Sequence, residues 1–267
     1  MKKIKIDAFS LLEKIKREKP LVHHLTNWVT IYDCANIVKI MGASPVMAHA
    51  KEEAGEMAGL ASSLVLNIGT LTPDFVEAMK VAAKAANQKK IPVVLDVCGA
   101  GATTLRDKKS FELLQECRID IIKGNASEIS RIAGENVRTK GVDSLQVKSN
   151  LSEIARKLSK ERTCIVVITG KEDIVVSKDK FYLIKNGHPR MSEIVGTGCM
   201  ATSVIATFAA VCRDFAYAAT AALLCFEISA QCAAKKTSGP GGFKEKLLDC
   251  LYFLDKKTIN RMQRVEG

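Results

Sequence analysis

The run Gly-Thr-Gly-Cys at residues 196–199 is the part of the sequence best suited to phosphoryl chemistry. Gly196 and Gly198 let backbone N–H groups approach a ligand closely, and the small residues after Cys199 predict a helix. The first N–H groups of a helix have no intrahelical partner, so such a turn binds anions. The same field lowers the pKa of a thiol, so Cys199 can take a proton from an attacking hydroxyl. A glycine-rich helix start with an inert buried cysteine fits these residues equally well.

Charged side chains follow two apolar runs earlier in the chain. Asp96 ends one run and opens a glycine-rich loop, where its carboxylate can hold a metal or a catalytic water, or merely cap the loop. Asn125, with Glu128 three residues later, forms a capping box at a helix start. In the functional interpretation Glu128 organises Mg²⁺ through water and Lys123 meets phosphate. Both interpretations hold together if Glu128 also faces the cleft.

Several common site motifs are missing from the sequence. No GxxxxGK[ST] occurs, and no GxGxxG follows a predicted strand. The nine cysteines form no CxxC pair and the four histidines no HxxxH pair, so we expect reduced thiols in a cytoplasmic protein and no transition-metal site. His23, His24 and His49 are more typical of hydrogen-bonding residues in a core or on a surface than of ligands.

Composition is that of a globular protein with a basic surface. The 267 residues are 47% hydrophobic and 26% charged, with a net charge of +11, which excludes a disordered chain. Most lysines have acidic neighbours, as in Lys171-Glu172-Asp173, and only 5% of residues are aromatic. A solvated surface or an anionic small substrate therefore fits the charge better than nucleic acid does.

Neither a signal peptide nor a membrane span is predicted. No apolar segment develops after Met1. The uncharged stretch 194–212 leaves about 15 helical residues after its glycines, which is too short to span a bilayer.

Short apolar runs alternating with helical segments predict a doubly wound α/β fold with a mostly parallel central sheet, in one domain spanning residues 1–267. A hairpin, 174–177 with 181–184, is expected at the edge of the sheet. The expected strands are 21–25, a short one near 46, 64–67, 93–96, 119–122 and 165–169. The expected helices are 7–18, one from a Thr26-Asn27 cap to 40, 51–60, 73–89, 108–116, one from 125, 146–159, 198–212, 214–236 and 242–262.

Ligands of open parallel sheets bind beyond the carboxyl ends of the strands. Asn67, Asp96, Lys123 and Thr169 all follow or end predicted strands, and Gly196 opens a helix. We therefore expect these positions to meet at one edge of the sheet.

Together these motifs resemble the hydroxyethylthiazole kinases of thiamine biosynthesis. The similar segments occur in the family's order between about residues 20 and 243. They are Pro20-Leu21-Val22-His23, Thr26-Asn27, Gly42-Ala43-Ser44-Pro45-Val46-Met47, Asn67-Ile68-Gly69-Thr70-Leu71-Thr72, Gly124-Asn125-Ala126-Ser127-Glu128, Val195-Gly196-Thr197-Gly198-Cys199 and Gly239-Pro240-Gly241.

The resemblance implies a ribokinase-like fold without the lid of sugar kinases, and transfer of the γ-phosphate of ATP, with Mg²⁺, to the alcohol of 4-methyl-5-(2-hydroxyethyl)thiazole. It also implies a homotrimer with active sites between subunits. Carried over by motif, the thiazole contacts are Asn27, Met47 and Gly196, the nucleotide contacts are Lys123, Asn125, Thr169 and Gly198, the metal residue is Glu128, and the catalytic residues are Cys199 and Asp96.

Three segments depart from the family pattern. Asp96 is followed by Val97-Cys98 where the family usually has Pro-Val, Lys123 stands where arginine is frequent, and His24, Leu25 and Trp28 are unusual in the substrate segment. These departures concern fine specificity more than reaction type.

Three other interpretations stay open. The chain could be a related small-alcohol kinase, such as one for hydroxymethylpyrimidine. Its lysine-rich surface could bind RNA, or Cys199 could act as a covalent nucleophile.

Overall fold

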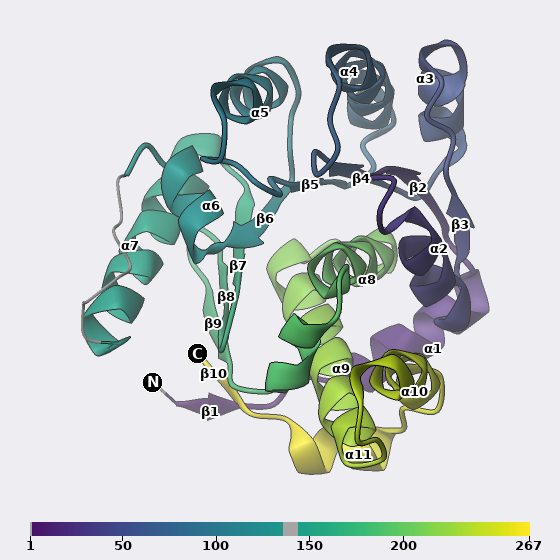
Figure 1. Ribbon diagram of the computed structural model, residues 1–267, viewed down its shortest axis with the longest axis vertical. Coiled ribbons are helices and arrows are strands. Elements are labelled where there is room, and N and C mark those ends of the chain that lie inside the picture. Colours follow the sequence, from purple (N-terminus) through teal and green to yellow (C-terminus); the bar gives the residue numbers. More distant parts are fainter. Residues whose placement is uncertain (1, 136–143) are drawn as a thin grey trace.

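The central strands are buried along almost their whole length because helices cover both faces of the sheet (Figure 1). In β5 (Val93–Asp96), Val94 packs toward one helical layer, whereas Val93 and Leu95 pack toward the other. The computed structural model describes residues 2–135 and 144–267. Within them the predicted α/β sheet with helices on both faces is confirmed.

The described sheet has ten strands in the order β1-β10-β9-β8-β7-β6-β5-β4-β2-β3. From β3 to β7 neighbouring strands are parallel, and from β7 to β1 they are antiparallel. The strands are β1 (Lys3–Ile4), β2 (Leu21–Leu25), β3 (Ser44–Val46), β4 (Ser63–Asn67), β5, β6 (Ile121–Asn125), β7 (Ile165–Thr169), β8 (Asp173–Val176), β9 (Phe181–Ile184) and β10 (Val265–Glu266).

Two layers of helices bury the two faces. One contains α3 (Lys51–Leu60), α4 (Pro73–Lys89), α5 (Thr104–Glu116), α6 (Ala126–Ile132) and α7 (Ser144–Arg162). The other contains α1 (Ala8–Glu18), α2 (Ile31–Ile40), α8 (Thr197–Val211), α9 (Phe215–Ala234), α10 (Pro240–Tyr252) and α11 (Lys256–Met262). Figure 1 shows the sheet curving around α8 and α9, and α8 packs against β4 and β5.

Some predicted boundaries are wrong. Thr26 and Asn27 do not cap α2, which begins at Ile31 after the N-cap Thr30. The predicted hairpin forms, but β10 pairs with β9 and β1 with β10, so it is not at the edge. The last helix is two, because Asp255 caps α11 after a break. Lys123 lies inside β6, which extends beyond the predicted strand end.

One helix in the described part of the chain, α9, is long and apolar enough by composition to cross a membrane. It packs against α8 and α10, and 78% of its most apolar window is buried. This burial is typical of a core helix, which passes the same test of length and composition.

Candidate active site

Polar side chains from three parallel strands meet at the carboxyl edge of the sheet. In the strand register Asn67 lies opposite Asp96, and Asp96 lies opposite Lys123. The start of α8 lies beside them, because a Cβ added at Gly198 would come within 3.3 Å of Lys123 Nζ. Residues predicted to share one edge therefore do so.

Asp96 and Lys123 form a buried ion pair at this edge. Asp96 Oδ2 accepts hydrogen bonds from Lys123 Nζ at 3.2 Å and Asn67 Nδ2 at 3.0 Å, and from the Thr202 hydroxyl at 2.7 Å. Burial disfavours the lysine charge, but attraction to Asp96 and to the nearby Cys199 and Glu128 outweighs it and raises the pKa of Lys123. The other oxygen, Asp96 Oδ1, is buried and has no hydrogen-bond partner in the described part of the chain.

Cys199 lies in the first turn of α8, surrounded by hydrogen-bond donors. Its sulfur accepts from Asn27 Nδ2 at 3.2 Å and Asn67 Nδ2 at 3.3 Å, and it is also hydrogen-bonded to Cys98 and Thr30. The bond from Cys98 is the largest cause that lowers the pKa of the Cys199 thiol, to about 6, against the opposing effect of burial. Cys199 is therefore mainly a thiolate at neutral pH.

The turn before α8 requires glycine at its N-cap. Gly196 has φ +97°, and a Cβ there would lie 2.7 Å from Thr30 Cγ2. Asn27 Oδ1 in turn accepts from the Thr30 backbone N–H at 3.1 Å and from its hydroxyl at 3.0 Å. The segment after β2 and the start of α8 thus fix each other.

Glu128 is engaged by both of its carboxylate oxygens. Oε2 accepts from the backbone N–H of Asn125 and Oε1 from that of Gly99, each at 2.7 Å. The predicted capping box is confirmed, because Asn125 Oδ1 also accepts from the Glu128 N–H. Glu128 therefore holds the loop after β5 against the start of α6.

These groups line a cavity of about 410 Å³. Nine of the predicted site residues contribute to its wall: Asn27, Asp96, Lys123, Asn125, Glu128, Thr169, Gly196, Gly198 and Cys199. Met47, which follows β3 and is half-buried, is not among the lining residues. The structure therefore brings together every predicted site residue except Met47.

A larger cavity of about 810 Å³ adjoins the first and shares Thr169 and Gly198 with it. Its wall carries the cationic side chains Lys171, Lys185 and Arg264. A cavity of this volume accommodates a ligand of nucleotide size.

Two buried acids, Asp173 and Glu227, face each other in the wall of the larger cavity. Burial raises the pKa of Asp173 to about 7, and burial together with the neighbouring Asp173 raises that of Glu227. Asp173 Oδ2 is buried without a hydrogen-bond partner in the described part of the chain, so burial beside a second acid favours the protonated form. Reading Lys171-Glu172-Asp173 as solvated surface was wrong for Asp173, which is only 2% exposed.

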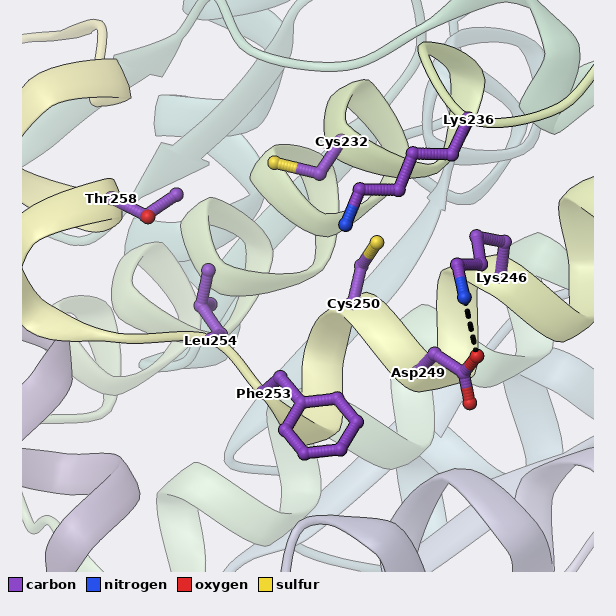
Figure 2. A pocket seen from close by; sticks show the side chains of 8 residues that line it. All are labelled: Cys232, Lys236, Lys246, Asp249, Cys250, Phe253, Leu254 and Thr258. Carbon is purple, nitrogen blue, oxygen red and sulfur yellow. Dashed lines mark hydrogen bonds and ion pairs between the residues drawn. The ribbon is translucent and has the colours of Figure 1, made fainter.

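A hollow between α9, α10 and α11 is a weaker candidate (Figure 2). Its volume is about 130 Å³, too small for a nucleotide, and its side chains include Cys232, Cys250 and the ion pair Lys246–Asp249. It lies away from the carboxyl edge of the sheet and holds none of the predicted site residues.

The histidines behave as core hydrogen-bonding residues. His23 Nε2 bonds the carbonyl of Ala48 at 2.6 Å, and His24 bonds Ser203 and the carbonyl of Val22. Burial lowers the pKa of His24 to about 4, so it is neutral at pH 7.

Sequence reasoning missed four contacts of the site. Asn67 was noted only as a motif, and Thr30, Cys98 and Thr202 were given no role. Thr202 carried a usable signal, because it lies one helical turn after Gly198 and faces the same side of α8. The contacts of Asn67 and Cys98 depend on how strands and α8 approach one another.

Comparison with known proteins agrees with this geometry. Residues 12–257 match the profile of the Hydroxyethylthiazole kinase family. The chain belongs to the hydroxyethylthiazole kinase family. It is 50% identical over 255 residues to a hydroxyethylthiazole kinase of Methanosarcina mazei, covering 96% of this chain and 98% of that one. With the enzyme of Thermoanaerobacter pseudethanolicus it shares 46% identity over 258 residues, at 96% and 98% coverage.

Solved structures support the same assignment. The hydroxyethylthiazole kinase of Pyrococcus horikoshii OT3 superposes with a TM-score of 0.90 at 35% identity, covering 97% of this chain and 98% of that one. A ribokinase-like superfamily protein of Enterococcus faecalis V583 aligns with a TM-score of 0.64 at 12% identity, over 94% and 98% of the two chains, and shows the fold alone. As a hydroxyethylthiazole kinase family member, the chain is an ATP-dependent kinase with the ribokinase-like fold.

Proposed function

We propose that this kinase transfers the γ-phosphate of ATP to the primary alcohol of 4-methyl-5-(2-hydroxyethyl)thiazole, giving the thiazole phosphate used in thiamine biosynthesis and salvage. One observation carries the proposal: Lys123, Asp96, Cys199 and the start of α8 converge on the 410 Å³ cavity. Phosphoryl transfer needs cations and N–H donors for the phosphate oxygens, together with a base near the acceptor hydroxyl.

On the acceptor side, Cys199 takes the proton of the alcohol as its oxygen attacks phosphorus. The thiolate is preformed by its donors, so no further group has to ionise it. Asp96 holds Lys123 in place through Oδ2, and its unpartnered Oδ1 accepts a hydrogen bond from the hydroxyl that enters the cavity. Asn27 and Gly196 contact the thiazole ring in this proposal.

On the nucleotide side, Lys123 and the N–H groups at Gly198 neutralise the transferred phosphoryl group. Asn125 and Thr169 lie along the wall that leads from the smaller to the larger cavity. The adenosine part of ATP occupies the larger one, with its phosphates toward Gly198.

Magnesium fits this site through Glu128. Its carboxylate lies in the cavity wall, and carboxylate oxygens are the ligands Mg²⁺ prefers. Both oxygens already accept a backbone N–H, so Glu128 holds the ion through water. When bound, Mg²⁺ neutralises charge on the β- and γ-phosphates.

A homotrimer with shared sites would account for the apolar surface beside the cavity. Val29 and Val195 line the cavity and are 68% and 71% exposed, and Trp28 and Tyr32 are 48% and 75% exposed. A partner subunit over this rim would bury these side chains and exclude water from the reaction. Met47, which does not reach the cavity within one chain, contacts the thiazole in such an assembly.

The remaining proposals concern the whole chain. Residues 1–267 act as one domain, supported by one continuous described sheet. All nine cysteines are free thiols, which favours the cytoplasm. Small molecules, and neither nucleic acid nor a membrane, are the proposed partners.

ADP release with and without the thiazole alcohol tests the proposed reaction. We expect ADP formation that requires both the alcohol and Mg²⁺. Faster turnover of hydroxymethylpyrimidine would assign the chain to that substrate instead, and ADP release independent of any alcohol would contradict both.

A further inference from the structure

Two cysteines far apart in the sequence line the acceptor cavity, which is the 410 Å³ cavity where the alcohol is proposed to bind. Cys98 follows β5, Cys199 lies in the first turn of α8, and both are half-buried in the wall of the 410 Å³ cavity. The Cys98 thiol donates a hydrogen bond to the Cys199 sulfur. The other seven cysteines are not among the residues that line this cavity.

The surroundings fix the two segments that carry these sulfurs. Asn27 and Asn67 fix Cys199 through its sulfur, and the Gly99 N–H bond to Glu128 fixes the loop that carries Cys98. A disulfide has a sulfur–sulfur distance of about 2.05 Å. Both side chains lie in the wall of one cavity, so rotation about their Cα–Cβ bonds can bring the two sulfurs together.

We propose that Cys98 and Cys199 form a site of reversible oxidation by hydroperoxides, which closes a disulfide across the acceptor cavity. The cavity admits small molecules to both sulfurs. Nothing in the proposed kinase reaction uses Cys98 as a nucleophile, so this second thiol gives the site a separate chemistry.

The chemistry balances with hydrogen peroxide as the oxidant. The Cys199 thiolate attacks one peroxide oxygen, the O–O bond breaks, and a sulfenic acid and a hydroxide form. The hydroxide takes up the proton that the Cys199 thiol released to solvent and becomes one water. The Cys98 sulfur then attacks the Cys199 sulfur, the S–OH bond breaks, and the Cys98 proton leaves with the hydroxyl as a second water. In sum, two thiols lose two electrons and two protons, and one peroxide becomes two waters. A dithiol such as dithiothreitol reverses the reaction by exchange.

Oxidation should stop the kinase reaction, because the sulfur that takes the proton is then bonded. This consequence rests on the proposed role of Cys199. The disulfide itself does not, so it is measured separately by mass.

Peptide mapping provides the direct test. The enzyme is treated with hydrogen peroxide, alkylated and digested with trypsin. We expect peptide 91–106, which contains Cys98, joined to peptide 191–213, which contains Cys199, at a mass about 2 Da below the sum of the two. ADP release with the thiazole alcohol should fall at least about tenfold and return with dithiothreitol.

Two variants identify the partners. Cys98→Ser keeps a donor to Cys199 but removes the second sulfur, so the linked peptide should vanish. Cys199 should then gain oxygen in steps of about 16 Da, and lost activity should not return with dithiothreitol once the sulfinic acid forms. Cys212→Ser is the matched control, since Cys212 is also in peptide 191–213 but lies at the far end of α8, about 20 Å from Cys199. It should behave as the wild type does.

Either of two results would overturn the proposal: no linked peptide from the wild type, or a link that is lost in Cys212→Ser, which would place the bond on Cys212 instead of Cys199. Each activity is compared with that of the same untreated variant. A linked peptide from a protein that never releases ADP would uphold the disulfide and refute the proposed kinase reaction.

Discussion

The half-buried thiol of Cys199 and the buried pair Asp173–Glu227 are acids in neighbouring cavities, yet their pKa values are shifted in opposite directions. Four side chains hydrogen-bond to the Cys199 sulfur, and its pKa is lowered to about 6. Asp173 Oδ1 accepts one backbone N–H, from Gly170 at 3.0 Å, and its pKa is raised to about 7. The number of donors, more than burial, therefore decides which buried acid is charged.

Lys123 acts on both the Cys199 thiol and the Asp173–Glu227 pair, since its charge lowers the pKa of Cys199 and of Asp173. Lys123→Met should abolish this shared influence and leave Asp96 as a buried unpaired charge. We expect kcat to fall about a hundred- to a thousandfold, as for loss of a charge-stabilising donor. Stability should fall by about 3–5 kcal/mol, measured by urea unfolding.

Lys123→Arg is the matched control, because it keeps the charge. Activity within about tenfold of the wild type would attribute the loss in the methionine variant to charge. An arginine variant as inactive as the methionine variant would instead assign the effect to packing near Gly198.

Cys199→Ser removes the thiolate, because the serine hydroxyl stays protonated among the same donors. We expect kcat to drop about ten- to a hundredfold, whereas Cys199→Asp keeps substantial activity because its carboxylate is ionised. The lowered pKa also predicts a pH profile: wild-type kcat rises as pH increases through about 6, when the thiolate forms.

The serine variant should lack that rise. Steady-state rates from pH 5 to 8, under conditions where chemistry limits turnover, provide the measurement. The same rise in the serine variant would assign it to another group and exclude Cys199 as the base.

For the Asp173–Glu227 pair the shifted pKa predicts a pH dependence of stability, and stability falls as pH rises. The pKa of Asp173 is higher in the folded state than its ordinary 3.8, so the folded protein binds the proton more tightly. This contribution to stability is complete below about pH 4 and is lost as pH rises toward about 7. Lys123 opposes part of this shift, because its attraction to Asp173 lowers the pKa of that carboxyl.

Asp173→Asn removes the titrating carboxyl. Unfolding free energies of wild type and variant, compared at pH 4.5 and 7, should differ by about 2 kcal/mol in their pH dependence, with the variant losing less as pH rises. Parallel curves for the two proteins would contradict the raised pKa of Asp173 in the folded state.

Glu128 has more hydrogen-bond donors than Asp173 and fewer than Cys199, since each of its two oxygens accepts one backbone N–H. Glu128→Gln replaces one acceptor with an NH₂ group, which cannot accept from Gly99 or Asn125. We expect a stability loss of about 1–2 kcal/mol from the unmet donor. Turnover should fall about tenfold, roughly 1.4 kcal/mol in the barrier, if Glu128 also organises Mg²⁺.

Raising the Mg²⁺ concentration separates the two effects. Partial recovery of turnover at unchanged melting temperature would assign the activity loss to the ion. Full activity in a destabilised variant would leave Glu128 with its capping role alone.

Much of the site could be predicted because its residues end strands. Periodicity located β2, β4, β5 and β7 within one or two residues, and parallel strands bring their carboxyl ends to one edge, so Asp96, Lys123 and Thr169 had to be near one another. The glycines of 196–198 predicted a turn into a helix, and Asn125 with Glu128 predicted the capping box.

For other features the sequence contains only weak signals. Glu227 is the only charged residue of α9, which marks a buried acid, but nothing in the sequence identified Asp173 as its partner. Asp173 stands beside Lys171 and Glu172, where charge alone indicates surface. Met47 was carried over from the family motif, and one chain does not bring it to the cavity.

The sequence by itself determined the order of the central strands and the helices between them, the shared edge and the family, because these follow from local periodicity, turn chemistry and motif spacing. Only the tertiary structure decided the protonation of the buried acids and the contact between Cys98 and Cys199. Both depend on which donors and sulfurs from distant segments come within hydrogen-bonding distance, and that is set by how α8 and α9 pack into the curve of the sheet.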